Sequence, residues 1–451
     1  MQNYAQHYDH PRMQLYITAV QTNTKVTVKV TVKVPPLNFK QEKSLKAGES
    51  VTISLPTAVE MYGCQKSPNV VRIEASADVS VTSFNYKLYT ADTSVVYPTT
   101  EWGTEYFIFT PHGTAYHSYK EFAVTNGKLS NTVEIFPEGS IRFEGRYYKR
   151  GSKITIDLKP YESVQLQSGD DLSGSRVSSK HPVAVFTGHA CTSRFSKCNH
   201  VYEQLLPASK WGTSFIIPPL RFQTKYDSVY LLASQPTRVT VNIGSRKSDY
   251  SLSRGQIKEL TYHNPETLFI QSDHGIQVLL LFNGVKHGWY IYDPFLMTIM
   301  STDRFCSSYS LNALDNFDNK ALIVAKNSAK ETLRFDSKNL PGAVQWKKVT
   351  GTEFSWAEIS YKQAHANNIH TVSSSGSSFA VYSIGIRQRS GYGAPAQCIQ
   401  QGKRPTGVPQ PLKINISHKL TSVIQALICA LFSRIWTFVL QQCLLQSKRG
   451  V

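Results

Sequence analysis

Apolar and polar residues alternate along short segments through most of the chain, a pattern typical of β-strands that bury one face. From Leu15, the segment "LYITAVQTNTKVTVKV" consists of an apolar strand, a polar turn and an alternating strand. The same order of strand, turn and strand begins again at Glu121, at Val229 and at Ala321. Helical periodicity is nearly absent before residue 420. The pattern therefore predicts an all-β chain with an internal repeat.

Each repeat also ends alike, with a final apolar strand that follows a polar turn, as in "TLFIQSDHGIQVLLLFNG". About seven short strands in roughly 100 residues match a β-sandwich better than a single four-stranded blade. We therefore expect four tandem β-sandwich-like repeat units, and a closed β-propeller-like ring of the four units is the alternative. The predicted domain covers residues 1–397, and its units cover about residues 15–109, 121–218, 228–305 and 321–390.

The segments that join the units repeat as well. "VYPTTEWGTEYFIFTP" and "LLPASKWGTSFIIPPL" share a proline, then Trp-Gly, then an aromatic strand. We expect the two tryptophans to fill equivalent places in the core rather than to stack against sugars. The third such segment, "YDPFLMTIMSTDRF", keeps only a proline and an apolar run. The structural junction residues are Pro98, Trp102, Gly103, Pro207, Trp211 and Gly212.

Residues 398–451 differ in character from the rest of the chain. A polar, proline-containing linker is followed by "TSVIQALICALFSRIWTFVLQQCLL", which Arg434 interrupts. A membrane-spanning helix needs about 20 residues without a central charge. An amphipathic helix, or the tail of an aberrant gene product, is therefore favoured over membrane association. Asn415 begins the only N-glycosylation sequon, a weak candidate site within this tail.

The chain carries 49 Lys and Arg against 31 Asp and Glu, a formal net charge of +18. Such an excess favours polyanionic partners. The basic residues are nevertheless spread in short groups such as "YYKRGSK", with no arginine-rich helix, finger spacing or aromatic RNA-binding signature. We therefore expect a solvated basic surface and no binding of nucleic acid, and a general polyanion binder is one alternative function.

The segment "GHACTSRFSKCNHVYEQLLPASKWG" contains four residues of types that can bind a metal, form a disulfide or act in catalysis. These are His189, Cys191, Cys198 and His200. As a zinc site it would have the spacing H-x-C-x6-C-x-H, which is not a usual one. As a thiol nucleophile, either cysteine would need a base held by a third group. Two cysteines so close in an oxidising compartment more naturally form a disulfide, which is the favoured interpretation. Two unpaired, buried cysteines are the fourth.

A disulfide between Cys191 and Cys198 would close a short loop and present basic residues at its tip. We expect residues 188–210 to form a long loop between units, the kind of segment on which recognition is often placed. The pairing of the remaining cysteines stays open; these are Cys64, Cys306, Cys398, Cys429 and Cys443. The candidate binding residues of the loop are His189, Arg194, Lys197, His200 and Glu203.

Signatures of enzymes and cofactor sites are missing from the sequence. It contains no G-x-S-x-G elbow, no phosphate-binding glycine loop and no dinucleotide fingerprint. Asp170 and Asp171 in "SGDDLSG" are better explained as an ordinary turn than as an ion site. We therefore expect no catalytic residues, no metal and no cofactor, and a metal- or thiol-dependent enzyme that uses the Cys/His cluster is the rival hypothesis.

The run "G-H-x-C … K-C-N-H-x-x-E-Q-L-x-P … W-G-x-x-F", Gly188 through Phe215, resembles the N-terminal domain of the IgG Fc-binding protein family. "YPTTEWGTEYF", "SDHGIQVLLLF" and "GYGAPA" extend the resemblance over roughly residues 1–397. It implies a secreted, non-enzymatic module of mucus that binds the Fc part of immunoglobulin G. Larger family members continue into cysteine-rich domains, and no cysteine-dense region follows Cys398 here, so we expect a truncated member or an incomplete gene model. No signal peptide is visible at the N-terminus.

Taken together, these features predict a secreted interaction or adhesion module. Its expected partners are immunoglobulin G Fc or mucin-type glycoproteins, and the expected contact lies in the loops between units.

Overall fold

The computed structural model describes residues 1–3, 11–19, 25–34, 37–113, 118–362 and 369–399. Within these ranges the elements are β-strands and short 3-10 turns, and the strands pair antiparallel, which confirms the all-β class. None of the helices in these ranges is long and apolar enough to span a membrane. The apolar tail and the sequon at Asn415 lie outside the described residues.

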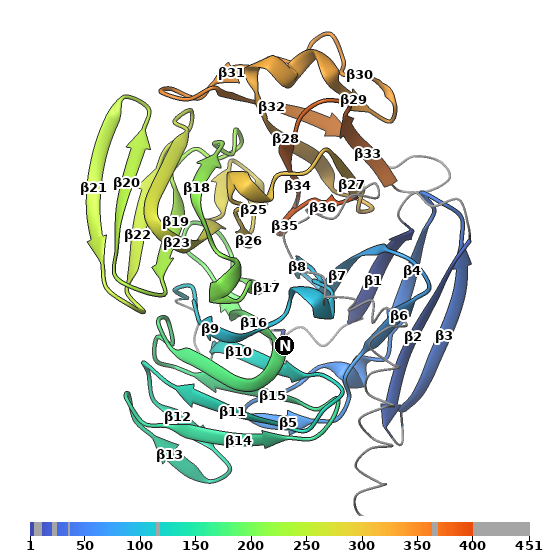
Figure 1. Ribbon diagram of the computed structural model, residues 1–451, viewed down its shortest axis with the longest axis vertical. Coiled ribbons are helices and arrows are strands. Elements are labelled where there is room, and N and C mark those ends of the chain that lie inside the picture. Colours follow the sequence, from blue (N-terminus) through green and yellow to red (C-terminus); the bar gives the residue numbers. More distant parts are fainter. Residues whose placement is uncertain (4–10, 20–24, 35–36, 114–117, 363–368, 400–451) are drawn as a thin grey trace, which may run out of the picture. The chain divides into compact units, whose positions relative to one another are not determined.

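Two sheets form the first part of the chain (Figure 1). In β2, Val26, Val28, Val30 and Val32 are fully buried while Thr27 is exposed, so the alternation in the sequence turns one face of the strand into core. This face meets Leu15 and its neighbours on the other sheet. The first sheet has the order β4 (Ser50–Leu55), β1 (Arg12–Ala19), β7 (Val79–Lys87), β8 (Thr90–Val95), and the second has β3 (Leu37–Leu45), β2 (Val26–Val34), β6 (Arg72–Ala75).

The next part is organised around one long strand, β16 (Arg176–Thr192). It pairs with β11 up to Ser179 and with β10 from Val183 onward. On its other edge it pairs with β9 up to Val183 and with β17 from Phe186 onward. The change of partners falls at Pro182, which has no N–H to give to a ladder. The strands around it are β9 (Gly103–Phe107), β10 (Lys120–Asn126), β11 (Asn131–Phe136), β14 (Ile154–Leu158), β15 (Ser163–Ser168) and β17 (Asn199–Gln204), with a hairpin of β12 (Ile141–Phe143) and β13 (Arg146–Tyr148).

The third part repeats this plan around β23 (Leu268–Phe282). Residues up to Ser272 pair with β20, and residues from Ile276 pair with β19, so the change of partners falls beside Gly275. The strands involved are β18 (Gly212–Ile217), β19 (Asp227–Ala233), β20 (Thr237–Ile243), β21 (Arg246–Leu252), β22 (Ile257–Tyr262) and β26 (Phe295–Thr298), with a hairpin of β24 (Val285–His287) and β25 (Tyr290–Tyr292).

The last part again has two facing sheets, joined by a core that includes Leu311 and Val372 from one sheet and Ile323 and Val381 from the other. One sheet has the order β31 (Lys347–Lys348), β32 (Phe354–Tyr361), β28 (Asp318–Lys326), β34 (Phe379–Arg387), β35 (Ser390–Pro395). The other has β30 (Lys338–Asn339), β29 (Leu333–Phe335), β33 (Ile369–Ser374), β27 (Ser308–Asn312), β36 (Gln397–Cys398). β5 (Gln65–Ser67) instead pairs with β15. The 3-10 turns are η1 (Thr57–Val59), η2 (Thr99–Glu101), η3 (Ala208–Lys210), η4 (Thr302–Arg304) and η5 (Asn327–Thr332).

Four inner strands connect these parts. β8 contacts β17, β17 contacts β26, β26 contacts β35, and β35 contacts β8, which closes a cycle (Figure 1). Side chains rather than a backbone ladder link β8 to β17. Asn199 both accepts a hydrogen bond from the Ala91 N–H (2.8 Å) and donates to the Ala91 and Pro294 carbonyls (2.7 Å each).

Side-chain oxygen atoms of β8 accept hydrogen bonds from every second backbone N–H group of β17. The His200 N–H donates to Thr90 Oγ1 (2.8 Å), and the Gln204 N–H donates to Ser94 Oγ (2.9 Å). Between them, the Tyr202 N–H donates to a carboxylate oxygen of Asp92 (3.2 Å). The polar residues of β8 are therefore buried because they take the place of a neighbouring strand's carbonyls.

The junction tryptophans occupy matching positions. Trp102 ends η2 and donates its indole N–H to the Tyr97 carbonyl (3.2 Å), and Trp211 ends η3 and donates to the Leu206 carbonyl (3.0 Å). Both side chains are half-buried, which is less than the full burial expected of them. Each is followed by a glycine, and Gly103 lies so close to Pro207 that a side chain there would overlap the proline ring.

The third junction has the same backbone turn as the other two, although its sequence keeps only a proline and an apolar run. η4 begins after Ser301 and ends at Phe305, with backbone angles at both residues that match those beside η2 and η3. Ser301 and Phe305 stand here in place of the proline and tryptophan that flank the turn in the other two junctions. Cys306 follows the turn directly, as Gly103 and Gly212 do, and it forms a disulfide with Cys398. A covalent bond thus stands where the earlier junctions have a close glycine contact.

Candidate functional site: the disulfide-closed hairpin

The Cys/His segment forms a β-hairpin rather than a long loop. β16 ends at Thr192 and β17 begins at Asn199, so only residues 193–198 form the turn. The interpretation of residues 188–210 as one inter-unit loop is therefore wrong. Cys191 and Cys198 are joined by a disulfide with a Cα–Cα separation of 5.1 Å across the base of the turn. Neither sulfur is a free thiolate, so the pair does not offer the ligands or nucleophile of the rival interpretations.

Three of the predicted binding residues lie inside the protein. His189, His200 and Glu203 have no exposed surface, because they sit on strands that are covered on both faces. They are not positioned to contact a partner. Sequence reasoning missed this because polar residues on both faces of a strand resemble a loop, and only their partners from distant segments allow burial.

The two histidines are held in the neutral form. Burial lowers the pKa of His189 to about 3, and its Nδ1 accepts a hydrogen bond from the Cys191 N–H (3.0 Å). Burial also lowers the pKa of His200 well below its ordinary value. Its Nδ1 lies 3.2 Å from the His189 carbonyl and its Nε2 lies 3.4 Å from the amide nitrogen of Asn85, an arrangement that fits a proton on Nδ1. Within the described residues, no group of three or more His, Cys, Asp or Glu side chains could hold a metal ion.

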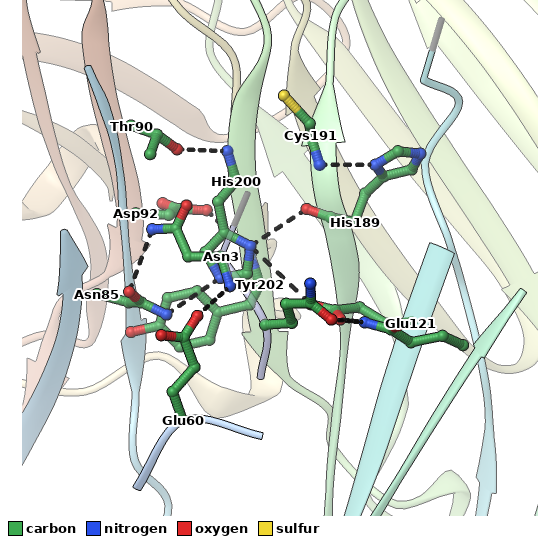
Figure 2. A network of polar contacts seen from close by, with 12 residues as sticks. Asn3, Glu60, Asn85, Thr90, Asp92, Glu121, His189, Cys191, His200 and Tyr202 are labelled. Atoms are coloured by element: carbon green, nitrogen blue, oxygen red, sulfur yellow. Dashed lines mark hydrogen bonds and ion pairs between the residues drawn. The ribbon is translucent and has the colours of Figure 1, made fainter. Parts of the chain in front are cut away.

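A buried polar network continues from His200 toward the N-terminal segment (Figure 2). Asn85 accepts a hydrogen bond from the side-chain amide of Asn3 (3.2 Å), whose backbone N–H donates to Glu60 (2.8 Å). Glu60 forms an ion pair with Lys87 at 2.8 Å, and their side chains are only 0% and 2% exposed. Lys87 also donates to the Asn3 carbonyl (3.2 Å). No pattern in the sequence marked these residues, because they come together from separate segments.

Buried carboxyl groups surround the inner strands. Burial raises the pKa of Glu203 to about 8, although a hydrogen bond from the Thr298 N–H (3.0 Å) favours the ionised form. Burial likewise raises the pKa of Asp92 well above its ordinary value and that of Asp293 to about 7. Glu203 and Asp92 accept hydrogen bonds from backbone N–H groups of neighbouring strands and so join those strands, whereas Asp293 is buried without a hydrogen bond among the described residues.

The tip of the hairpin offers aromatic and basic side chains at the surface. Arg194 forms an ion pair with Glu259 at 3.2 Å and also contacts the Tyr226 hydroxyl at 3.2 Å. The rings of Phe195 and Tyr226 meet edge to face at 4.8 Å, and the Lys225 ammonium lies 4.5 Å from the Phe195 ring centroid. These contacts hold Arg194 and Phe195 against the third part of the chain.

The remaining predicted binding residue, Lys197, is exposed beside this cluster. The Phe195 N–H donates to the Asn283 carbonyl (3.1 Å), and Gly284 lies so close to Ser196 that a side chain added there would overlap the serine. The tip is therefore fixed at its base by the disulfide and along its length by the strands beside it. Such an arrangement can present fixed cationic and aromatic groups to a partner.

Comparison with known proteins identifies relatives of the chain. A family model described as "IgGFc binding protein" matches residues 92–385. The human IgGFc-binding protein is 33% identical over 398 residues, which are 88% of this chain and 7% of the relative. The chain thus spans a small fraction of that relative's length. These matches confirm the resemblance found in the sequence.

Proposed function

The chain belongs to the IgGFc-binding protein family, and from this premise we propose that it is a secreted, non-enzymatic interaction module. Its proposed partner is the Fc part of immunoglobulin G, the ligand that the name of the human relative states. Mucin-type glycoproteins are the second proposed partner. The observation that carries the proposal is the hairpin of residues 193–198, a short, disulfide-closed turn with cationic and aromatic side chains.

Rigidity is what makes this hairpin suitable for binding. A partner that meets ordered side chains loses less conformational entropy on association than one that must order a loop. The disulfide, the Arg194–Glu259 ion pair and the Phe195 ring contact all restrict the turn before a partner arrives. Of the five residues predicted from the sequence, Arg194 and Lys197 are the ones that remain in the proposed site.

The two disulfides support secretion. Cys191–Cys198 and Cys306–Cys398 would persist in an oxidising compartment and are unusual in the cytosol. The domain proposal is that residues 1–397 form four sandwich-like units whose inner strands close a ring. Facing sheets around buried cores, and the cycle of contacts through β8, β17, β26 and β35, support this proposal.

A capture experiment tests the proposed function. The full chain, immobilised, is presented with Fc, Fab and mucin at about 0.15 M and about 1 M salt, conditions between which exposed charges become strongly screened. We expect Fc to be retained over Fab at both salt concentrations. Equal retention of all acidic glycoproteins at low salt, with complete loss at high salt, would instead identify a general polyanion binder.

A further inference from the structure

We propose that the Cys191–Cys198 hairpin is one part of a larger protein-binding surface whose anchor is Trp289. This inference rests on the proposed function and names the surface that would bind the partner. The surface, here called the hairpin-tip face, consists of the turns that lead into the four inner strands. Its residues are 88–89, 193–198, 286–291 and 388–389.

Contacts between the turns make the face continuous. The Arg389 guanidinium lies 5.0 Å from the centroid of the Tyr89 ring, and the Arg389 N–H donates to the Ile291 carbonyl at 2.7 Å. Gln388 donates to the Trp289 carbonyl (3.1 Å) and accepts from the Ile291 N–H (2.9 Å). The backbone of the β24–β25 hairpin is thus hydrogen-bonded to the turn of residues 388–389, which in turn contacts Tyr89.

The same hairpin meets the disulfide-closed turn on its other side. Gly284, just before β24, lies so close to Ser196 that an added side chain would overlap the serine. Each turn of the face is therefore linked to the next by a specific contact.

Large apolar side chains are unusually exposed on this face. Trp289 is 94% exposed, Tyr290 is 62% exposed and Tyr89 is 45% exposed. An indole of this size in contact with water has a large hydrophobic free energy to gain from burial. Its backbone is already fixed by Gln388, so little ordering is needed on binding. Tryptophan in such a setting is the residue type most enriched among interface hot spots.

The charge of the face indicates the chemistry of the partner. Its turns contain Arg194, Lys197, Lys286 and Arg389 and no Asp or Glu. Glu259, the carboxylate beside Arg194, is already paired with it at 3.2 Å, and Asp293, just after β25, is fully buried. The complementary surface is a folded protein with an apolar pocket for the indole and carboxylates around that pocket.

The test measures the binding of Fc and of mucin to the wild-type chain and to two alanine variants, one at Trp289 and one at Tyr147. Trp289→Ala should weaken the Kd for the captured partner by about tenfold or more, as expected for a hot spot. Tyr147→Ala is the matched control, because Tyr147 is 63% exposed on β13, outside the face. Thermal melts of both variants should match the wild type, since neither side chain is buried.

The outcomes separate the two proposals. If the wild-type chain captures a partner and Trp289→Ala captures it equally well, the hairpin-tip face is wrong and the proposed function stands. If the wild-type chain captures neither Fc nor mucin, the proposed function fails and this inference fails with it. An arm with vesicles of phosphatidylcholine and phosphatidylserine covers the remaining occupant: loss of vesicle binding alone in Trp289→Ala would assign the face to a membrane and overturn the inference.

Discussion

At the scale of single residues, the buried ion pair between Lys87 and Glu60 depends most strongly on its neighbours, because both charges are removed from water. Both side chains are buried, and the pair survives because Glu60 also accepts the Asn3 N–H and Lys87 donates to the Asn3 carbonyl. Removing one partner would leave an uncompensated charge in the interior, where water cannot solvate it. The pair is thus a point at which a single substitution has a large effect.

We expect Lys87→Met to lower the free energy of unfolding by about 3–5 kcal/mol, the usual cost of breaking a buried ion pair. Lys153→Met, in the exposed pair with Glu134 at 2.9 Å, is the control and should cost under about 1 kcal/mol. Urea unfolding followed by circular dichroism measures both. Equal effects of the two substitutions would contradict the importance of burial at Lys87.

A second residue-scale prediction concerns pH. Glu203, with a folded pKa of about 8, and Asp293, with one of about 7, retain protons that the unfolded chain has released. Stability from these groups is present at low pH and is lost as the pH rises toward 8. Buried histidines act in the opposite sense, but only below their ordinary pKa of about 6.5. Between pH 6.5 and 8 the carboxyl groups therefore determine whether stability rises or falls with pH.

The melting temperature should accordingly fall as the pH rises from about 6.5 to 8. Glu203→Gln keeps the shape of the side chain and cannot ionise. The fall of the melting temperature with pH should therefore be less steep in this variant. Glu134→Gln, at an exposed position, should leave the slope unchanged. Differential scanning fluorimetry across this range gives the three slopes, and a wild-type melting temperature that rises with pH would refute the account.

At the scale of elements, the two disulfides have different roles. Cys191–Cys198 spans a sequence separation of 7 and shapes one turn, whereas Cys306–Cys398 spans 92 and joins the two ends of the last part of the chain. The entropy removed from the unfolded chain grows with the length of the closed loop. The longer bridge should therefore contribute more to the free energy of unfolding. The shorter bridge should contribute more to the fixed shape of the hairpin.

Replacing Cys306 and Cys398 with serine should cost about 4–5 kcal/mol by loop entropy, against about 2 kcal/mol for Cys191 and Cys198. Denaturant unfolding of the two double variants without reductant measures the difference. We expect the Cys191/Cys198 variant, in turn, to lose more affinity for the captured partner. A larger stability loss from the short bridge than from the long one would contradict the assignment.

At the scale of the whole molecule, a cycle of inner strands links the described parts of the chain to one another. β8, β17, β26 and β35 contact one another in turn, and β5 joins a sheet built mainly from later residues. Tandem sandwiches without such contacts would unfold independently. Here the loss of one part removes hydrogen-bond partners from the next, as for the Gln204 N–H and Ser94.

We therefore expect thermal unfolding of the chain to show a single main transition. Far-ultraviolet circular dichroism and tryptophan fluorescence should report coincident midpoints, and the calorimetric and van't Hoff enthalpies should agree. Well-separated transitions for the different probes would show that the parts of the chain unfold as independent domains.

The amino-acid sequence by itself determined the class of fold and the family. Period-two alternation, as in the valines of β2, is a local consequence of burying one face of a strand, so it could be recognised without a structure. The Trp-Gly junctions and the Gly188 to Phe215 run are likewise local. The Cys191–Cys198 pairing was also within reach, because two cysteines so close in one turn have few other geometries.

Only the tertiary structure decided which polar residues are inside. His189, His200 and Glu203 have the composition of a binding loop, yet each is buried because segments distant along the chain supply partners. These are Ser118 for His189, Asn85 for His200 and Thr298 for Glu203. The Lys87–Glu60 pair and the hairpin-tip face depend in the same way on contacts between distant segments. Burial and adjacency are properties of the packed chain, and no local pattern encodes them.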